Sequence, residues 1–207
     1  MFKTIAQNAC AEIVEKKSKF IANIYYVESV EEAEELIKQA NKKYFDARHN
    51  CYAFSVMSEN GPVNRFSDDG EPSGTAGGPM LNILTSQNLS NVLIIVTRYF
   101  GGILLGTGGL VKAYTGASIE ALNKAEIVEK ALGKETEFVV NYPDLEKLKY
   151  YFKQNNINIV NIEYGENAKV VAEITDVKLE KLLQEKENLN FKIIEHKILR
   201  EKFIKIM

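Results

Sequence analysis

The distribution of glycine constrains the fold more than any other feature of the sequence. Nine of the thirteen glycines lie between residues 70 and 109, in two clusters separated by the apolar segment 91–97. A glycine costs about 0.5–1 kcal/mol inside a regular helix or strand, so such a concentration requires positive φ angles or a close approach of other groups. Acidic residues flank the first cluster and Arg98 begins the second. We therefore expect two loops that form the walls of one site.

Length and charge limit the class of protein. A chain of 207 residues holds one large domain or two small ones. Its net charge of −2 gives no global positive field for nucleic acid, although a local basic patch is compatible with it. No apolar run approaches the roughly 20 residues of a membrane span, and the first residues lack the apolar segment of a secretory signal. Cys10 and Cys51 are expected to be free thiols, and the protein to be cytoplasmic with no membrane partner.

The first part of the chain predicts an α+β domain. Alternation of β-forming residues over 10–27 predicts a hairpin whose turn lies at residues 16–18. Ser29 begins a capping box, and apolar residues at helical spacing continue to Tyr44. The further elements expected are a strand at 51–57, a helix at 80–87, a buried strand at 91–97 and a helix at 110–124.

A domain boundary is predicted from Gly133 to Glu137, where a glycine among charged residues precedes a new strand, and it divides the chain into 1–133 and 134–207. The second part has the element order βαββαβ, which is typical of a ferredoxin-like domain. It contains no glycine cluster, so we expect a binding or dimerising module, and homo-oligomerisation with it. Its expected elements are strand 138–141, helix 144–154, strands 157–164 and 169–174, helix 177–187 and strand 191–199.

The glycine clusters contain neither standard nucleotide motif. Segment 101–106 has the glycine spacing of a P-loop, but Thr107 and Gly108 follow where Lys and Ser/Thr are required. Segment 106–111 ends in Val111 and follows a loop, whereas the dinucleotide fingerprint ends in glycine or alanine and follows a strand. Two interpretations of segment 107–109 remain open: an anion site before a helix, or tight turns and close helix packing.

The acidic turn has two interpretations as well. Asp68, Asp69 and Glu71 supply three hard oxygen ligands within four residues, as Mg²⁺ would require. An ordinary solvated turn explains the same residues, and we favour it.

Arg98 leaves the apolar strand and enters the second glycine loop. Its guanidinium can fork onto the phosphate or carboxylate of a ligand, or form an internal ion pair with the acidic turn, which we favour. In the first case Tyr99 or Phe100 could stack on a base.

Nucleophilic catalysis has little support in the sequence. The only histidines are His49 and His196, and they fall in different predicted domains. Cys51 lies two residues from His49 and could share its face, but a buried cysteine that acts as a small hydrophobe is the simpler interpretation. We assign no catalytic residue and no metal ligand.

Five segments resemble the YigZ/IMPACT family: 17–22 (KSKFIA), 47–53 (ARHNCYA), 68–81 (DDGEPSGTAGGPML), 96–102 (VTRYFGG) and 105–114 (LGTGGLVKAY). The resemblance covers about the first 125 residues. It implies an N-terminal domain with the fold of the second domain of a small-subunit ribosomal protein. It also implies a C-terminal domain like the last domain of translocase elongation factors. Both folds recur around ribosomes and RNA, so the resemblance implies a role in translation.

Parts of the family pattern do not transfer to this chain. The eukaryotic member regulates the amino-acid-starvation kinase through an additional N-terminal interaction domain, and this chain begins with the shared domain, so that partner is not expected. Leu104 stands where many bacterial relatives have lysine, and Lys112 where arginine is frequent. Lysine keeps the charge but loses bidentate geometry, so both differences weaken a phosphate-binding loop.

We therefore expect a non-enzymatic regulator of translation that binds RNA, the ribosome or a translation factor through the cleft between the glycine loops. The alternative is a Mg²⁺-dependent enzyme acting on a small phosphorylated or acyl substrate. No cofactor and no sequence-specific binding of DNA are expected, and Arg48 and Arg65 would add charge to the cleft. The predicted ligand-binding residues are Asp68, Asp69, Glu71, Ser73, Arg98, Tyr99, Gly101, Gly102, Gly106, Gly108 and Lys112.

Overall fold

The computed structural model describes residues 1–58 and 60–206 of an α+β protein. Contacts divide it into two compact units, Phe2–Val128 and the residues from Glu129 onward. The first unit contains β1 (Phe2–Ile5), β2 (Ala9–Glu15), β3 (Ser18–Tyr26), α1 (Val30–Lys43), β4 (His49–Ser58), β5 (Gly61–Ser67), α2 (Gly77–Ser86), β6 (Val92–Tyr99) and α3 (Gly106–Leu122). The long strand β7 (Ile127–Val140) begins in the first unit and continues into the second.

The sheet of the first unit has the order β2-β3-β6-β4-β5, and every pairing is antiparallel. Strand β6 lies at its centre, and its residues from Val92 to Arg98 are all buried. Successive side chains of a strand point to opposite faces, so an unbroken apolar run requires cover on both faces. The predicted buried strand at 91–97 is therefore the middle of a three-layer unit.

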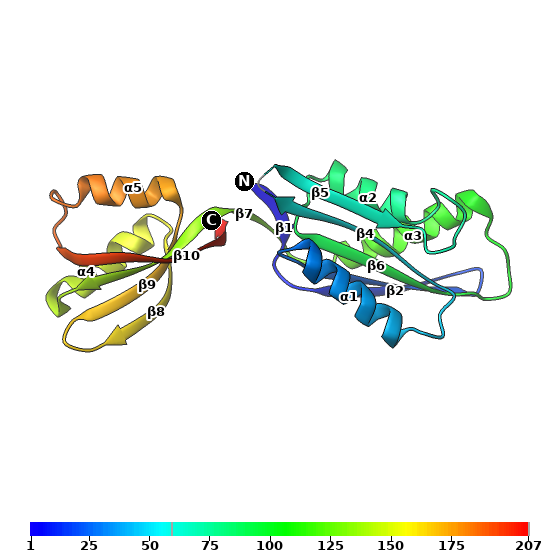
Figure 1. Ribbon diagram of the computed structural model, residues 1–207, viewed down its shortest axis with the longest axis horizontal. Helices are drawn as coiled ribbons and strands as arrows, with labels where there is room; N and C mark the ends of the chain where they lie inside the picture. The colour runs from blue at the N-terminus through cyan, green and yellow to red at the C-terminus, as the bar shows by residue number, and fades with distance from the viewer. Residues whose placement is uncertain (59, 207) are drawn as a thin grey trace. The chain divides into compact units, whose positions relative to one another are not determined.

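Helices cover the two faces of this sheet differently (Figure 1). Helices α2 and α3 pack on the face that carries Ile94 and Val96, and α1 packs on the face that carries Leu93 and Ile95. The N-terminus of α1 is capped as the sequence predicts, because the Ser29 hydroxyl accepts a hydrogen bond from the Glu32 amide at 3.1 Å.

The predicted hairpin at the start of the chain is present as β2 and β3. Its turn residues Lys16 and Lys17 have φ angles of 44° and 66°, the pair of positive values that a tight two-residue hairpin requires. The turn approaches the second glycine loop so closely that a Cβ at Gly101 would overlap the backbone carbonyl group of Lys17. Gly101 is therefore a close-approach glycine of the kind that the clustering predicts.

Several element limits differ from the sequence prediction. Strands β1 and β5 are not among the predicted elements, because β1 is only four residues long and β5 is an exposed edge strand with an irregular burial pattern. The predicted helix starts at Met80 and Leu110 are too late, since α2 begins at Gly77 and α3 at Gly106. Glycine lowers helix propensity, so glycine-rich first turns have the sequence character of loops.

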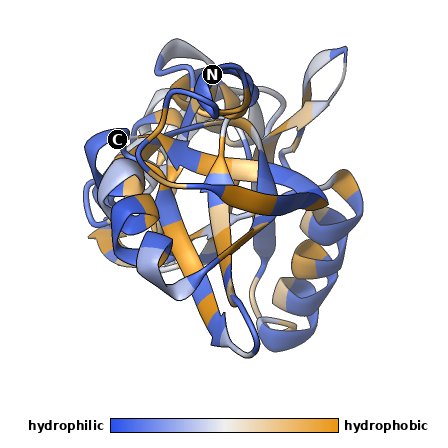
Figure 2. Cartoon of the chain, turned by 90° about the vertical axis from the view of Figure 1, so that its left-hand side faces the viewer, coloured by the Kyte–Doolittle hydropathy of each residue, from blue (hydrophilic) through white to orange (hydrophobic). Residues whose placement is uncertain are grey.

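The second unit continues with α4 (Tyr142–Gln154), β8 (Asn158–Tyr164), β9 (Ala168–Ile174), α5 (Asp176–Glu185) and β10 (Ile193–Ile206). The predicted element order βαββαβ is therefore present. In its sheet the strands β7, β9 and β8 are neighbours in that order, and β10 also pairs with β7. In Figure 2 hydrophilic and hydrophobic residues alternate along strands of this unit, and along β9 alternate residues are buried. Phe138, Leu148 and Phe152 form the centre of its own core.

The predicted boundary between 133 and 134 falls inside β7, which is a continuous strand. Packing against β10 explains the glycine at position 133, because a Cβ there would lie 2.5 Å from the side chain of Ile204. In the part of the chain that the structure describes, no helix is both long and apolar enough to cross a membrane.

Candidate functional site

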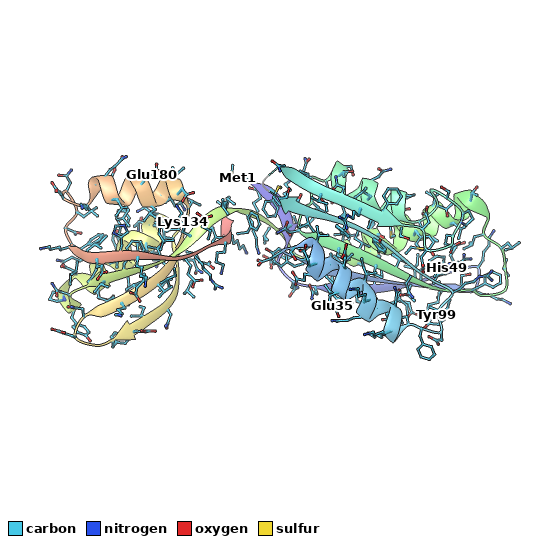
Figure 3. The ribbon with its side chains drawn as sticks, in the orientation of Figure 1. Met1, Glu35, His49, Tyr99, Lys134 and Glu180 are labelled. Atoms are coloured by element: carbon cyan, nitrogen blue, oxygen red, sulfur yellow. The ribbon has the colours of Figure 1, made fainter. Side chains whose placement is uncertain are left out.

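The two glycine loops border one pocket of about 330 Å³. The first loop joins β5 to α2 and the second joins β6 to α3. Figure 3 labels His49, at the start of β4, and Tyr99, at the end of β6. In the sheet His49 is paired with Arg98 of β6. The pocket is lined by Arg48, His49, Gly70, Glu71, Pro72, Arg98, Phe100, Leu104, Leu105, Gly106, Thr107 and Leu110.

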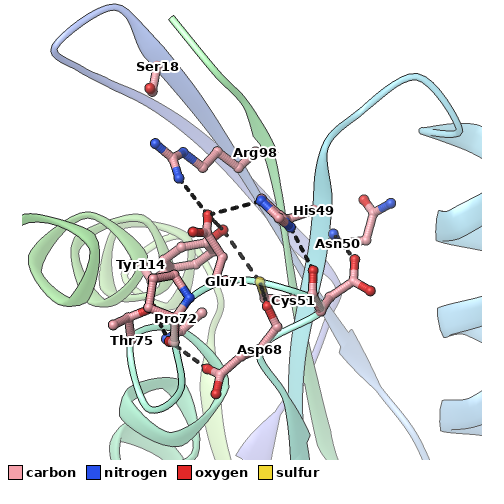
Figure 4. A network of polar contacts seen from close by, with 12 residues as sticks. Ser18, His49, Asn50, Cys51, Asp68, Glu71, Pro72, Thr75, Arg98 and Tyr114 are labelled. Atoms are coloured by element: carbon pink, nitrogen blue, oxygen red, sulfur yellow. Dashed lines mark hydrogen bonds and ion pairs between the residues drawn. The ribbon is translucent and has the colours of Figure 1, made fainter. Parts of the chain in front are cut away.

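Glu71 is the centre of the polar network in this pocket (Figure 4). Its Oε1 accepts hydrogen bonds from Nη1 of Arg98 at 2.6 Å and from the hydroxyl of Tyr114 at 2.9 Å. Nε2 of His49 lies 3.9 Å from the same oxygen. The side chains of Glu71 and Arg98 are only 3% and 6% exposed, so the two charges neutralise each other away from water. The internal ion pair that the sequence favours is thus present and joins the two loops.

Arg98 is only partly used by this ion pair. Nη1 makes the single hydrogen bond of its guanidinium within residues 1–58 and 60–206, and Nε is buried without a partner there. The guanidinium contacts two aromatic rings, 5.5 Å from the centre of Phe20 and 5.6 Å from that of Phe100. Such cation–π contacts leave the N–H groups of Nε and Nη2 able to donate hydrogen bonds.

Asp68 caps helix α2 from outside the helix. Its carboxylate accepts hydrogen bonds from the amides of Gly74, Ala76 and Gly77 at 2.8, 2.9 and 2.8 Å. Burial by itself would raise the pKa of this carboxyl, but the three amides bind the charged form and lower the pKa below its ordinary value. The side chain thus holds the first glycine loop in shape.

Asp69 supports the start of β4. Its Oδ2 accepts a hydrogen bond from the Asn50 amide at 2.6 Å, and its carbonyl oxygen lies 2.6 Å from Nδ1 of His49. Its φ of 43° lies in the left-handed region. Among the described residues, no group of three or more His, Cys, Asp or Glu side chains is arranged to hold a metal ion.

Cys51 has no access to the pocket. Its Sγ lies 3.0 Å from the carbonyl oxygen of Asp68 and 3.4 Å from the hydroxyl of Tyr114, and the residue is fully buried. Burial, the main cause, raises the pKa of the thiol to about 12. The thiolate that nucleophilic catalysis needs is therefore disfavoured, and Cys51 acts as a small buried side chain.

Comparison with known proteins identifies the family. Residues 16–122 match the Impact N-terminal domain, and residues 138–185 match a domain described as "Domain of unknown function (DUF1949)". The chain belongs to the IMPACT family. It is 38% identical over 188 residues to the IMPACT family member YvyE of Bacillus subtilis, a match that covers 91% of this chain and 82% of that protein.

Further relatives agree with this assignment. The IMPACT family member YigZ of Escherichia coli is 38% identical over 150 residues, which cover 72% of this chain and 74% of that protein. A solved structure titled "Crystal structure of an hypothetical protein" is 29% identical, covers 100% of this chain and 97% of its own, and superposes with a TM-score of 0.63. Both domains of the present chain are thus those of bacterial IMPACT family members.

The structure of this IMPACT family member brings only some of the predicted ligand-binding residues to the pocket. Glu71, Arg98 and Gly106 line it. Asp68, Asp69, Ser73, Tyr99, Gly101, Gly102, Gly108 and Lys112 lie outside its lining. The phenol of Tyr99 donates a hydrogen bond to Asp46 at 2.8 Å, and Arg65 forms an ion pair with Glu34 at 2.7 Å instead of adding charge to the cleft.

Sequence reasoning misses Leu105 and Leu110 as lining residues and Tyr114 as the second donor to Glu71. Thr107, which also lines the pocket, belongs to segment 107–109, for which an anion site is one of the two interpretations from the sequence. A signal for Tyr114 is present, because it is a polar aromatic residue on the apolar stripe of a predicted helix. Leu104 is 82% exposed and lines the pocket. This part of the lining is therefore apolar.

Proposed function

We propose that this IMPACT family member is a translation-linked regulator in the cytoplasm that binds RNA, free or on the ribosome, at the rim of the glycine-loop pocket. The observation that carries the proposal is the pairing of Phe100, 41% exposed, with the guanidinium of Arg48, which lies 5.9 Å from the centre of its ring. An exposed aromatic ring beside a cation offers a base a stacking surface and its phosphate a counter-charge.

Two further cations belong to the elements that border the pocket. Lys17 is in the hairpin turn that packs against Gly101, and Lys112 is an exposed residue of α3 outside the pocket lining. Neither these lysines nor Arg48 takes part in an ion pair among the residues that the structure describes. A protein of net charge −2 thus carries unpaired cations on the elements that border the pocket, and such cations can contact a phosphate backbone.

RNA is favoured over a protein partner because the exposed groups are cationic and aromatic. The alternative of a Mg²⁺-dependent enzyme is less favoured, since Asp68, Asp69 and Glu71 each accept hydrogen bonds from protein donors. Family membership supports translation as the context, through the resemblance to domains that recur around ribosomes.

The proposal includes the finer assignment of the two folds. The three-layer first unit is taken as a relative of the second domain of a small-subunit ribosomal protein. The βαββαβ unit is taken as ferredoxin-like, with a binding or dimerising role. Light scattering of the full chain against residues 1–133 tests that role, because a dimerising second unit makes only the full chain dimeric. Two monomers would contradict dimerisation.

Salt-dependent binding to RNA tests the proposed function. Binding of the full chain to a single-stranded oligoribonucleotide and to ribosomes is measured over a series of salt concentrations. We expect affinity to fall with salt. The double variant Lys17→Ala, Lys112→Ala should lower the log–log slope by about 0.7 for each phosphate that the wild type neutralises and the variant does not.

The matched control is the double variant Lys153→Ala, Lys181→Ala. It removes two exposed lysines from α4 and α5 of the second unit. The control should keep the wild-type slope. Absence of binding by the wild type at low salt, or equal reductions in both double variants, would contradict binding at this rim.

A further inference from the structure

The pocket contains an arginine whose hydrogen-bonding capacity is largely unused. The side chain of Arg98 is nine-tenths buried, yet its Nε has no partner, and the one hydrogen bond of its guanidinium within the described residues runs from Nη1 to Glu71. A buried N–H without an acceptor costs about 1–3 kcal/mol. The Nε and Nη2 edge of a guanidinium is the edge that receives two oxygens of a phosphate or carboxylate. An oxyanion in the pocket would satisfy it.

A second set of donors lines the same pocket. Helix α3 begins at Gly106, and the first amides of a helix have no carbonyl partner within the helix. The cap position is occupied by Leu105, whose apolar side chain cannot accept a hydrogen bond, and the fully described first turn of α3 holds no acidic residue. Gly106 and Thr107 line the pocket, so this turn faces the space next to Arg98. The helix dipole favours an anion there.

The charged side chains that line the pocket together favour the binding of an anion. The lining contains the cations Arg48 and Arg98, the carboxylate of Glu71 and the imidazole of His49. The charge of Glu71 is compensated by Arg98 and by the hydroxyl of Tyr114. Arg48 is exposed at the rim and has no carboxylate partner among the residues described. One uncompensated positive charge therefore remains for a ligand.

We infer that the pocket between the glycine loops is a binding site for a phosphomonoester group, held by Arg98 and by the first amides of α3. A phosphate is favoured over a carboxylate because two donor sets must be satisfied. Two of its oxygens can engage the guanidinium edge while a third accepts the amides, whereas a carboxylate has only two oxygens. The inference deepens the proposed RNA binding and rests on it for the location of the ligand.

The phosphate can come from two sources, the terminal phosphate of an RNA or a small phosphorylated molecule. The first experiment is a titration of the full chain with inorganic phosphate, followed by amide and Arg Nε–H resonances in NMR spectra. We expect saturable shifts confined to Gly106, Thr107, Gly108 and the Nε–H of Arg98. Shifts that do not saturate, or that spread evenly over surface amides, would overturn the proposal.

The variant Thr107→Glu tests the site without disturbing the buried ion pair. An acidic side chain in the first turn of a helix is compatible with the fold, but it competes with a phosphate for the same amides. We expect the affinity for inorganic phosphate to fall about tenfold or more. The matched control, Val177→Glu, places the same charge in the first turn of α5, at a residue that is 76% exposed. Equal affinity in Thr107→Glu and the wild type would overturn the proposal.

A second variant addresses the guanidinium edge. Arg98→Lys keeps a cation for Glu71 but has no fork, so phosphate affinity should fall while the variant still folds. The source is decided by comparing a 5′-phosphorylated oligoribonucleotide, the same oligoribonucleotide with a 5′-hydroxyl, and ribose 5-phosphate as the small-molecule probe. A clear gain from the 5′-phosphate indicates an RNA end, and binding of ribose 5-phosphate without such a gain indicates a small ligand. Binding of none of the phosphorylated probes would overturn the proposal.

The two proposals fail separately. Salt-dependent RNA binding that is unaffected by Thr107→Glu and Arg98→Lys, with no saturable phosphate binding, would overturn the phosphate site and leave RNA binding at the rim. Saturable phosphate binding without association with RNA or ribosomes would overturn RNA binding and leave a site for a small phosphorylated ligand.

Discussion

The three carboxylates of the acidic turn are similar as residues but have different partners. Asp68 accepts three backbone amides, Asp69 accepts one amide at the start of β4, and Glu71 pairs with a buried arginine. A metal site would need two or more of these groups to converge on one point with free lone pairs. Because protein groups donate hydrogen bonds to all three carboxylates, we infer that the acidic turn maintains the shape of the pocket.

Asp68 should make the stability of the protein depend on pH. Its pKa is lowered in the folded state, so its contribution is fully present above the unfolded value of about 3.9 and is lost as the pH falls through the lower folded value. The variant Asp68→Asn replaces one acceptor by a donor that faces an amide. We expect a loss of about 0.5–2 kcal/mol in the free energy of unfolding at pH 7.

Urea denaturation of both proteins from pH 7 to pH 3 measures this effect. The gap between wild type and variant should narrow below pH 4, because protonation removes the charge that the amides bind in the wild type. A constant gap over the whole range would mean that the loss in Asp68→Asn arises from packing and not from the carboxylate charge.

At the scale of elements, the second glycine loop combines glycines with different tasks. Gly101 lies against the backbone of the β2–β3 turn, whereas a Cβ at Gly108, in the first turn of α3, would have no atom within 4 Å. We expect Gly101→Ala to lower the free energy of unfolding by about 1–3 kcal/mol, since the turn must move. Gly108→Ala should raise it by up to about 1 kcal/mol, because alanine is the better helix former.

Chemical denaturation of the two variants compares the same chemical change at two sites of one loop. Equal effects would contradict the distinction between a close-approach glycine and a helical one. Hydrogen exchange of the β2–β3 turn provides a second readout, because protection there should fall in Gly101→Ala and stay unchanged in Gly108→Ala.

The sequence predicts those helices and strands that are specified by local signals. Segment 91–97 and the Ser29 helix are predictable, because a long apolar run and a capping box are local signals. The start of α2 is not, since its cap is Asp68, eight residues before Ala76 and outside the helix. Strand β5 is not predictable either, because an exposed edge strand has little apolar alternation to detect.

The site is predictable only to the level of the loops. Two glycine clusters beside a buried strand indicate a pocket and an ion pair between Arg98 and the acidic turn, but not which carboxylate pairs. The carboxylate that pairs, Glu71, also accepts a hydrogen bond from Tyr114 on α3, a residue 43 positions away in sequence. Hydrogen bonds of this range cannot be inferred from local spacing.

At the scale of the whole molecule, each compact unit has a core of its own. Buried residues of the first unit form clusters on both faces of its sheet, and Phe138, Leu148 and Phe152 belong to a separate cluster in the second unit. Because each core is formed by residues of one unit, the units should unfold as separate cooperative transitions.

The variant Leu148→Ala tests this separation. Leu148 is fully buried in α4, and its truncation should destabilise the second unit by about 2–5 kcal/mol. Hydrogen exchange measured by mass spectrometry over a denaturant series should show earlier exposure of α4, β8 and β9 with unchanged protection of β3, β4 and β6. Since the pocket lies entirely in the first unit, phosphate binding by this variant should equal that of the wild type. Simultaneous loss of protection in both units would mean that the chain folds as one cooperative body, and the pocket would then depend on the second unit for its stability.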